Sequence, residues 1–477
     1  EKSVLQQNDT FNTSKLWDRV YITTLFTFHY DKIIKTINFY KQAVGGTLDK
    51  IFVGGIAASL MPDQIYEETG IYPITGILNS PQQIGLRGTT NIDLLPPDYD
   101  ILDNNFYAIN DTLYAYTTRG CVNTCRWCGV NKLEPAYVPY IDIKSMIQEL
   151  REQYGDKAKL KLMDNNVLAS PKLGQIIDDL LELGYGRNQY TETKPKKRRV
   201  VDFNQGLDAS YFTEESMALL SKLNIRPMRI AFDRITEKRV YLKAIELAYD
   251  HGVTEFSNYM LYNFKDTPKD LYERLIINIK LNKKLSNSEK RASVYSYPMR
   301  FAPINEAHGK GENRKRDYVR ENRSKDRDWS KNPIWTKRFV RNIEIMKGAA
   351  HGAISPTPEL AMRTIGGDFQ EFVTNLYMPE ELLRNRSKHE KRIYDHEPKR
   401  ASGSGKIEAF REFILGLLEK QDSRFMFFHE SVSANSSEVI RQSILTCKDV
   451  EIIKWLKLYL KRGEFNFEVQ QLTKLTF

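Results

Sequence analysis

The stretch YAYTTRGCVNTCRWCGV, residues 114–130, holds three of the four cysteines of this 477-residue chain. Cys121, Cys125 and Cys128 are separated by three residues and then by two. Clustered cysteines in a chain with so few are more typical of a metal site in a reducing compartment than of a disulfide framework. The fourth, Cys447, lies far downstream in a helix-like run, RQSILTCKDVEIIKWL, where a buried and unreactive thiol is expected.

The sequence after these cysteines alternates between helix-like and strand-like segments. A strand, TLYAYTT, leads into the cysteine stretch, and a helix over 142–154 with Asp142 as its N-cap follows it. The further strands are LKLMD, RVVDFN, MRIAFD, EFSNYMLYN and SVYSYPMRF, and the helices between them begin near Ser170–Pro171, Thr213, residue 236 and Thr267–Pro268. The segment PIWTKRFVRNIEIMKG can supply the last helix. Because parallel strands need helical crossovers, these six strand–helix units predict an α/β fold with a partial (β/α)6 TIM-type barrel.

Two further regions flank the predicted barrel. The strands RVYITTLFTF, DKIFVGGIAASL and IYPITGIL and the helix HYDKIIKTINFYKQA predict a small Rossmann-like α/β domain with a parallel sheet over 20–105. Beyond residue 350 the sequence turns helical and charged, and 384–406 resembles a linker or a solvated surface. The predicted domains are 1–108, Rossmann-like; 109–305, the barrel; 306–400, a basic and mostly helical extension; and 401–477, a helical module.

The cysteine stretch directly follows the first barrel strand, at the carboxyl mouth where the active sites of such barrels lie. Three thiolates on one short loop can each bind one iron of a [4Fe–4S] cluster and leave the fourth iron open to a substrate or cofactor. Zinc is the alternative, but a structural zinc site uses four ligands, and no histidine or further cysteine lies nearby in sequence. A zinc site would need one of the seven distant histidines to fold in.

This spacing in this context resembles the radical S-adenosylmethionine (radical SAM) superfamily. The resemblance covers residues 110–300 and rests on C-x3-C-x2-C after the first strand and on Trp127, the aromatic residue directly before the third cysteine. It implies that Cys121, Cys125 and Cys128 hold a [4Fe–4S] cluster whose open iron binds S-adenosylmethionine (SAM). It also implies reductive cleavage of SAM to methionine and a 5′-deoxyadenosyl radical, which abstracts a hydrogen from a substrate.

The ends of the predicted strands should then supply contacts to SAM or to the substrate. The superfamily often has a Gly-Gly-Glu-like segment after the second barrel strand, where this chain has MDNNVLAS instead. Polar residues at strand ends are equally explained as caps and turns, and their repetition at one barrel face is what favours a site. With Trp127, the candidate cofactor-binding residues are Asp164, Asn165, Asn204, Gln205, Asp208, Asp233 and Asn263.

Residues 20–105 resemble the cobalamin-binding-like domain that precedes the barrel in several radical SAM groups. The usual D-x-H-x-x-G ligand motif is absent, because FHYDKII contains His29 without that spacing or the glycine. Some relatives bind cobalamin without this histidine, so cobalamin stays open, but a retained fold without the cofactor is favoured. Methylthiotransferases carry three more cluster cysteines in a related domain, and this chain has none before Cys121.

The formal charge of +10 is concentrated in two tracts. Residues 310–341 carry 12 Lys and Arg against 5 Asp and Glu, and KPKKRR at 194–199 adds five more cations. Tyr318, Trp329 and Trp335 lie within the first tract, which suits phosphate contact with base stacking, although a solvated face explains such runs equally well. Because both tracts are expected to flank the mouth, a nucleic-acid substrate is the leading expectation. The candidate polyanion-binding residues are Lys194, Lys196, Lys197, Arg198, Arg199, Arg314, Lys315 and Arg316.

The sequence therefore predicts a cytoplasmic radical SAM enzyme reduced by a flavodoxin- or ferredoxin-type donor. No membrane association is expected, because no uninterrupted apolar run approaches the ~18 residues of a membrane span. Two rival hypotheses stay open. A cobalamin-dependent radical SAM methyltransferase would hold a corrinoid visible by its absorption. A nucleic-acid-binding protein with a structural or redox-sensing Fe–S cluster would bind in a salt-dependent way without SAM turnover.

Overall fold

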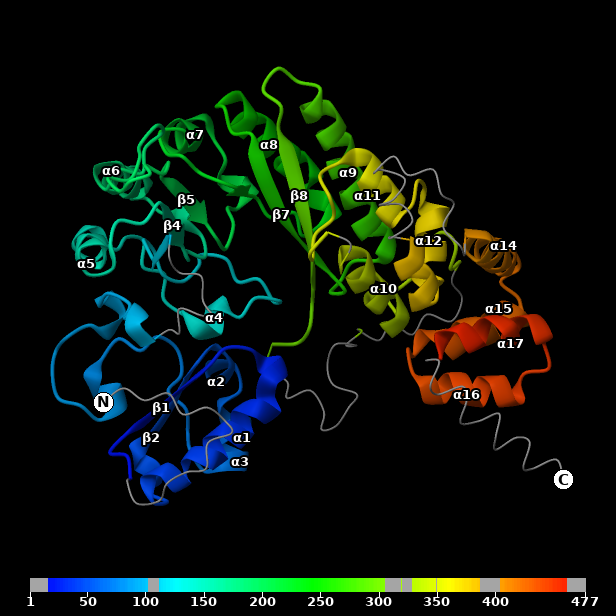
Figure 1. Cartoon of the computed structure of the whole chain (residues 1–477), viewed down its shortest axis with the longest axis horizontal. Helices are drawn as coiled ribbons and strands as arrows, with labels where there is room; N and C mark the ends of the chain where they lie inside the picture. The colour runs from blue at the N-terminus through cyan, green and yellow to red at the C-terminus, as the bar shows by residue number, and fades with distance from the viewer. Residues whose placement is uncertain are drawn as a thin grey trace. The chain divides into compact units, whose positions relative to one another are not determined.

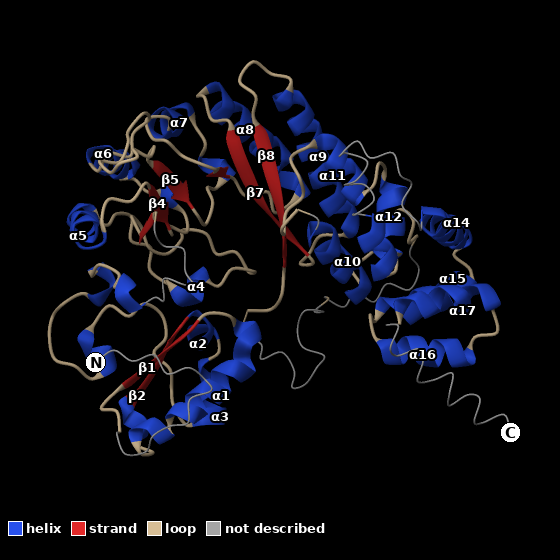
Figure 2. Cartoon of the chain, in the orientation of Figure 1, coloured by secondary structure: helices blue, strands red, loops and turns tan. Residues whose placement is uncertain are grey.

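The computed structural model describes residues 16–101, 111–304, 319, 328–348, 350–386 and 404–460. The chain divides into two compact units (Figure 1). The first comprises 1–230, 242–253 and 303–315, and the second comprises 231–241, 254–302 and 316–477. In both, parallel strands alternate with helices along the chain, as Figure 2 shows, so the mixed α/β class predicted from the sequence is confirmed.

The first unit begins with a two-stranded parallel sheet of β1 (Val20–Thr24) and β2 (Ile51–Gly55). Helix α1 (Tyr30–Tyr40) connects the two strands, and α2 (Ile56–Leu60) and α3 (Pro62–Thr69) follow β2. One face of α1 is buried against this sheet. The core comprises Ile33, Ile34, Ile37, Val53, Ala57, Ala58 and Ile65 among others.

The strand predicted over IYPITGIL is wrong. Residues 71–78 form no strand, although the Ile74 amide donates to the Val53 carbonyl at 2.8 Å. Pro73 has no N–H to donate to a ladder, and Gly76 has a φ of +76°, so the segment cannot continue alongside β2.

A second parallel sheet in the first unit positions the cysteines. It consists of β3 (Thr112–Ala115), β4 (Lys159–Leu162) and β5 (Val200–Phe203), with Thr112 opposite Lys159 and Lys159 opposite Val200. The connecting helices are α4 (Val130–Leu133), α5 (Lys144–Tyr154) and α6 (Leu173–Glu182). Next come α7 (Glu214–Leu220) and the short strand β6 (Met228–Arg229). The strand predicted over MRIAFD is therefore shorter than expected, although Ile230 also forms a bridge with Leu207.

Two of the helix starts predicted from the sequence are confirmed with their caps, and two others are displaced by a few residues. Thr213 and Thr267 are N-caps with capping boxes, as expected. Asp142 does not cap a helix from 142; α5 begins at Lys144, whose amide donates to the Asp142 carboxylate at 2.9 Å. Ser170 likewise accepts from the Lys172 amide at 3.0 Å, one turn before α6 begins at Leu173.

The second unit contains the longest strands of the described chain. β7 (Glu255–Tyr262) and β8 (Ser293–Arg300) pair in parallel over eight residues, joined by α9 (Pro268–Ser286). Helix α8 (Lys238–Asp250) spans the division between the units. The remaining helices are α10 (Lys337–Gly348), α11 (Pro358–Ile365), α12 (Phe369–Tyr377), α14 (Ser404–Lys420), α15 (Ser423–Ser433), α16 (Ser437–Thr446) and α17 (Val450–Leu456). Of the linker predicted at 384–406, residues 387–403 lie outside the described part.

Trp329 and Trp335 belong to the core of the second unit. Each is only 7% exposed. Trp329 packs on the His429 ring with 3.8 Å between ring centroids, and Trp335 packs on Tyr262 at 5.1 Å. The prediction that these two indoles stack on bases is therefore wrong, because their faces are already covered. Tyr318 lies outside the described residues.

His429 is expected to make the stability of the second unit depend on pH between 6.5 and 4. Its ring is buried, its Nδ1 lies 2.8 Å from the Tyr377 hydroxyl, and burial lowers its pKa from 6.5 to about 4. The unfolded chain takes up a proton as the pH falls below 6.5 and the folded chain does not, so stability decreases from pH 6.5 to pH 4. We expect a loss of about 3 kcal/mol across this window. Urea denaturation at pH 7.5 and pH 4.5 measures it, and His429→Gln should show a smaller pH dependence; an unchanged dependence would contradict the assignment.

None of the helices in the described part of the chain combines the length and the apolar character needed to cross a bilayer.

Candidate functional site

The three clustered cysteines lie on one loop that leaves the carboxyl end of β3. Cys121, Cys125 and Cys128 are all half-buried. A turn brings the Cys128 amide to the Cys125 carbonyl at 3.0 Å, and the Asn123 amide donates to the Cys121 Sγ at 3.4 Å. The loop therefore presents three thiols from one short segment, beside the end of a buried parallel strand.

The loop is closed at its base by a backbone neck. Arg119 and Val138 exchange two backbone hydrogen bonds of 3.0 and 2.9 Å, which pair the chain entering the loop with the chain leaving it. Gly120 occupies the left-handed region with a φ of +71°, and a Cβ there would lie 2.4 Å from the Ala136 carbonyl oxygen. The two segments can approach this closely only because residue 120 is glycine.

Glu134 fastens this neck through both of its carboxylate oxygens. One oxygen accepts from the Arg119 guanidinium at 2.9 Å. The other accepts from the Gly120 amide at 2.6 Å and from the Asn165 side chain at 2.8 Å. Arg119 also pairs with Asp93 and lies over the Tyr116 ring at 3.3 Å. This network is nearly enclosed, and its single cation, Arg119, faces two carboxylates; the hydrogen bond from the Gly120 amide to Glu134 fixes the residue next to Cys121.

Replacing Gly120 with alanine should open the neck. The added Cβ meets backbone rather than a movable side chain, and the left-handed conformation is strained for alanine, so we expect a destabilisation of at least about 2 kcal/mol. Iron bound per chain after anaerobic reconstitution should fall several-fold. Gly174→Ala is the matched control, because no atom lies within 4 Å of a Cβ at that position. Wild-type iron content in Gly120→Ala would show that the neck does not shape the loop.

Asp164 lies at the end of β4, directly beneath the loop entry. Its Oδ1 accepts hydrogen bonds from the amides and hydroxyls of both Thr117 and Thr118. Its Oδ2 is buried and makes no hydrogen bond to any described residue, and the same holds for the Oδ1 of the neighbouring Asn166. Burial raises the pKa of Asp164, whereas the threonine hydrogen bonds lower it. Two buried acceptor atoms beside the cysteine loop therefore have unsatisfied hydrogen-bonding capacity.

Tyr137 and Asn123 complete the surroundings of the loop. The Tyr137 hydroxyl donates to the Asn166 carbonyl at 3.3 Å, and burial raises its pKa to about 12, with Asp164 and Cys121 also raising it. The phenol is therefore protonated at neutral pH. The Asn123 side chain donates to Asp208 Oδ2 at 2.9 Å, so the loop is tied to the chain that follows β5.

The other predicted cofactor-binding residues in the first unit differ in their contacts and in their exposure to solvent. Asp208 also caps a short 3-10 helix through Ser210, so the cap and the loop contact coexist in one side chain. The Asn204 amide continues the ladder to Leu162. Trp127 is half-buried and Gln205 is exposed. Glu134, Tyr137 and the two threonines were missed, because each acts through a partner distant in sequence.

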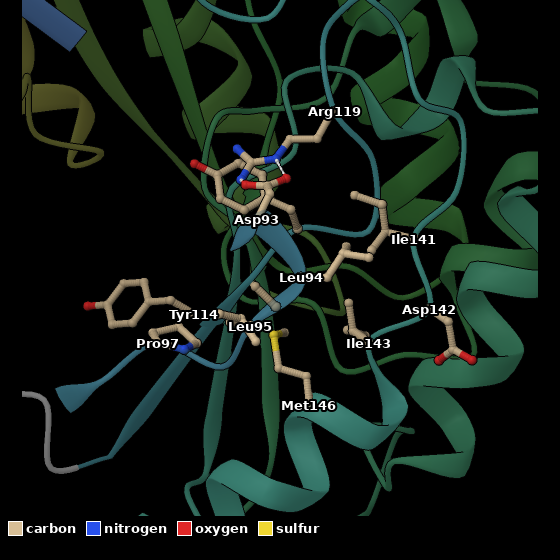
Figure 3. A pocket seen from close by; sticks show the side chains of 12 residues that line it. Asp93, Leu94, Leu95, Pro97, Tyr114, Arg119, Ile141, Asp142, Ile143 and Met146 are labelled. Carbon is tan, nitrogen blue, oxygen red and sulfur yellow. Dashed lines mark hydrogen bonds and ion pairs between the residues drawn. The ribbon is translucent and has the colours of Figure 1, made fainter. Parts of the chain in front are cut away.

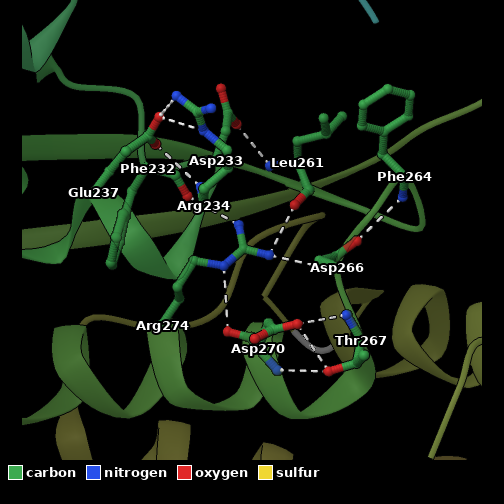
Figure 4. Close-up of polar contacts among 10 residues, drawn as sticks. All are labelled: Phe232, Asp233, Arg234, Glu237, Leu261, Phe264, Asp266, Thr267, Asp270 and Arg274. Carbon is green, nitrogen blue, oxygen red and sulfur yellow. Dashed lines mark hydrogen bonds and ion pairs between the residues drawn. The ribbon is translucent and has the colours of Figure 1, made fainter.

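Asp233 and Asn263 belong to the second unit, where each bonds to a backbone group near a strand end. Figure 4 shows the contacts of Asp233. Asp233 Oδ1 accepts from the Leu261 amide at 2.8 Å, and burial raises the Asp233 pKa to about 6. Asn263 has a φ of +67° and donates to the Phe301 carbonyl at 3.2 Å. Beside them, the fully buried Arg274 donates to the carbonyls of Phe232 and Leu261 and to Asp266.

The basic tract at 194–199 does not flank the mouth, which corrects the expectation from sequence. It connects α6 to the first residue of β5, whereas the cysteine loop follows the last residues of β3. Because β3, β4 and β5 are parallel, the two segments lie at opposite ends of the sheet. Arg199 is also buried and bound to Asp156 at 2.7 and 2.9 Å, which removes it from the cations available to a polyanion. Arg314, Lys315 and Arg316 lie outside the described residues.

A pocket of about 160 Å³ lies beside the neck rather than at the cysteines (Figure 3). Arg119 and Asp93 form its polar end, and Leu95, Ile143 and Met146 contribute to its apolar walls. Neither the cysteines nor any of the predicted cofactor-binding residues lines it. At its charged end, Arg119 is already paired with both Asp93 and Glu134.

No group of three His, Cys, Asp or Glu side chains in the described ranges is arranged as around a single metal ion. Thiolates that bind a four-iron cluster each contact a different iron atom, so they surround the whole cluster and need not converge on one point as the ligands of a single metal ion do.

Comparisons with known proteins identify no family. No protein-family model matches the sequence, and no curated protein matches it. A similar solved structure is that of HydG, described as a maturase of the [FeFe]-hydrogenase, at 16% identity and a TM-score of 0.30. The match covers 58% of this chain and 59% of HydG, so the chain spans less than two thirds of that protein. A likeness this weak carries no argument about fold or function.

Proposed function

We propose that this chain is a radical SAM enzyme that cleaves SAM reductively and abstracts a hydrogen atom from a substrate. The observation that carries the proposal is the loop with Cys121, Cys125 and Cys128 at the carboxyl end of β3, beside two buried acceptors that lack donors. The proposal includes a partial barrel built from β3 to β8 and their helices. It also includes a cobalamin-binding-like domain at the N-terminus that has kept the fold without the cofactor.

The residues around the loop fit the proposed groups. Three thiols on a fixed loop match a cluster that leaves one iron for SAM. The ammonium group of SAM is a strong donor, and the unsatisfied oxygens of Asp164 and Asn166 are acceptors of the kind it requires. Their burial strengthens such a contact, because an unpaired acceptor in a low-dielectric site costs free energy. In this proposal Asp164 and Asn166 take over the contact with the SAM amino group, which a Gly-Gly-Glu-like segment often makes in the radical SAM superfamily.

When bound, the reduced cluster would supply the one electron that breaks the carbon–sulfur bond of SAM, and SAM would supply the 5′-deoxyadenosyl radical, with methionine as the other product. The chain's own residues orient these groups and exclude water. Glu134 and Gly120 fix the start of the loop, and Asp164 holds Thr117 and Thr118 beneath it. Tyr137 is protonated at neutral pH, and its hydroxyl donates to the Asn166 carbonyl, which ties the chain that leaves the loop to the residue beside Asp164.

Anaerobic reconstitution of the full chain with iron and sulfide, followed by reduction in the presence of SAM, tests the proposal. We expect 5′-deoxyadenosine to form, and to be absent when either SAM or the reductant is omitted. Visible absorption of the purified protein tests the cobalamin-dependent rival, which predicts a bound corrinoid. A fully formed four-iron cluster without any 5′-deoxyadenosine would overturn the proposal in favour of a structural or redox-sensing cluster.

A further inference from the structure

Exposed cations gather at the end of the β3–β4–β5 sheet opposite the cysteine loop. We call this group the amino-edge patch; it comprises Arg187, Lys194, Lys196, Lys197, Arg198 and Lys222, all of which are exposed. Five of the six lie on the connection between α6 and β5, in the segment 186–199. Glu192 is the only acidic residue in that segment. The patch therefore carries a local excess of positive charge that its own segment does not neutralise.

The connection that carries the patch is an ordered hairpin. Tyr190 and Arg198 form an antiparallel bridge, and the Thr191 amide donates to the Lys197 carbonyl at 2.8 Å. The Lys197 amide in turn donates to the Thr191 hydroxyl at 2.9 Å. At its base, Arg199 makes a bidentate ion pair with Asp156 and donates to the Tyr190 carbonyl at 3.2 Å. Arg199 thus anchors the hairpin while the cations before it point to solvent.

A second segment extends the patch beyond the hairpin. The Arg187 amide donates to the Lys222 carbonyl at 3.0 Å, and Gly186 bridges to Leu223. These contacts bring Lys222 beside the start of the hairpin. The cations are therefore spread over two chain segments and form a surface rather than one extended run.

We propose that the amino-edge patch binds single-stranded nucleic acid. Cations on an ordered scaffold suit a chain of phosphates, because little conformational freedom of the backbone is lost on binding. Tyr190, which is 50% exposed within the hairpin, offers an aromatic face on which an unpaired base can stack. Bases in a duplex are already stacked, so the single strand is the form that uses both features. The proposal does not rest on the radical SAM proposal, because the patch and the cysteines lie at opposite ends of the sheet.

The test measures binding of the full-length chain to fluorescein-labelled 20-nucleotide single-stranded RNA and DNA, with the corresponding duplexes alongside. We expect Lys194→Glu/Lys196→Glu/Lys197→Glu/Arg198→Glu to weaken single-strand binding at least about tenfold at 0.1 M salt. The slope of log affinity against log salt should become shallower by about 3, since four cations are reversed. Tyr190→Ala should weaken binding without changing this slope.

A matched control reverses the same number of exposed cations elsewhere. Lys32 and Lys35 on α1 and Lys280 and Lys283 on α9 are exposed, and changing all four to Glu alters the net charge equally. If this control loses as much affinity as the hairpin variant, net charge alone explains binding and the proposal fails. Equal affinity for duplex and single-stranded nucleic acid would also overturn it. So would equal affinity for heparin and single-stranded RNA together with unchanged RNA binding by Tyr190→Ala. Cys125→Ala should bind nucleic acid like the wild type, which separates this result from the outcome of the SAM assay.

Discussion

Cys125→Ala is expected to bind far less iron after anaerobic reconstitution than the wild type and to form no detectable 5′-deoxyadenosine. In the proposed site each cysteine binds a different iron, so no neighbouring thiol can take over the lost ligand. Cys121→Ala and Cys128→Ala should behave in the same way. Because the neck is made of backbone and Glu134 contacts, circular dichroism and the urea midpoint of the iron-free variants should match those of the iron-free wild type.

Cys447→Ala is the matched control for these variants. Cys447 is half-buried at the C-terminal end of α16, in the second unit, and takes no part in the loop. It should keep the iron content and the product yield of the wild type. Full product formation by any of the three loop variants would contradict the proposed ligand set, and loss of product in Cys447→Ala would show that the assay reports folding.

Arg274→Met is expected to have the largest effect on stability. Arg274 is completely buried and donates to two carbonyls and to Asp266, whose pKa burial already raises to about 6. Methionine fills a comparable space but removes the cation that faces the buried Asp266 carboxyl group and the guanidinium donors to two carbonyls, which leaves Asp266 with the Phe264 amide as a donor. We expect a loss of about 3–5 kcal/mol near pH 8. Urea denaturation followed by tryptophan fluorescence measures it, since Trp329, Trp335 and Trp455 lie in the second unit.

The loss should be smaller near pH 5. A carboxyl group whose folded pKa is raised destabilises the fold at pH values where the unfolded chain has already given up the proton, and this penalty shrinks as the pH falls. Arg234→Met is the matched control, because Arg234 pairs with Glu237 at an exposed position and should cost less than about 1 kcal/mol. If both variants cost the same at both pH values, Arg274 does not hold the strand ends together.

Signals within a few residues predicted the mixed α/β class and several helix starts. Thr213 and Thr267 precede acidic first turns, and both cap the helices predicted for them. The position of the cysteine loop followed from one strand and the loop after it. The wrong strand prediction over 71–78 could have been avoided from the sequence, because Pro73 and Gly76 both disfavour the hydrogen-bond ladder of a sheet.

The site was less accessible from sequence because its contacts join distant residues. Nothing near Glu134 shows that its carboxylate binds Gly120 and Asn165. Asp164 was predicted as a polar strand end, but its bonds to Thr117 and Thr118 depend on the pairing of β3 with β4. The place of the 194–199 tract was predictable, since any connection from a helix to a parallel strand lies at the amino end of the sheet.

The neck between Arg119 and Val138 affects how the site is assembled. It is made by the polypeptide alone, so the entropy of closing the loop is lost when the chain folds and not when iron arrives. Loading then has to order only the segment inside the closed loop. Before loading, that segment is the part of the site most open to proteolysis and to oxidation of its thiols. In the proposed site, the lifetime of the iron-free protein should therefore depend on how quickly the cluster is delivered.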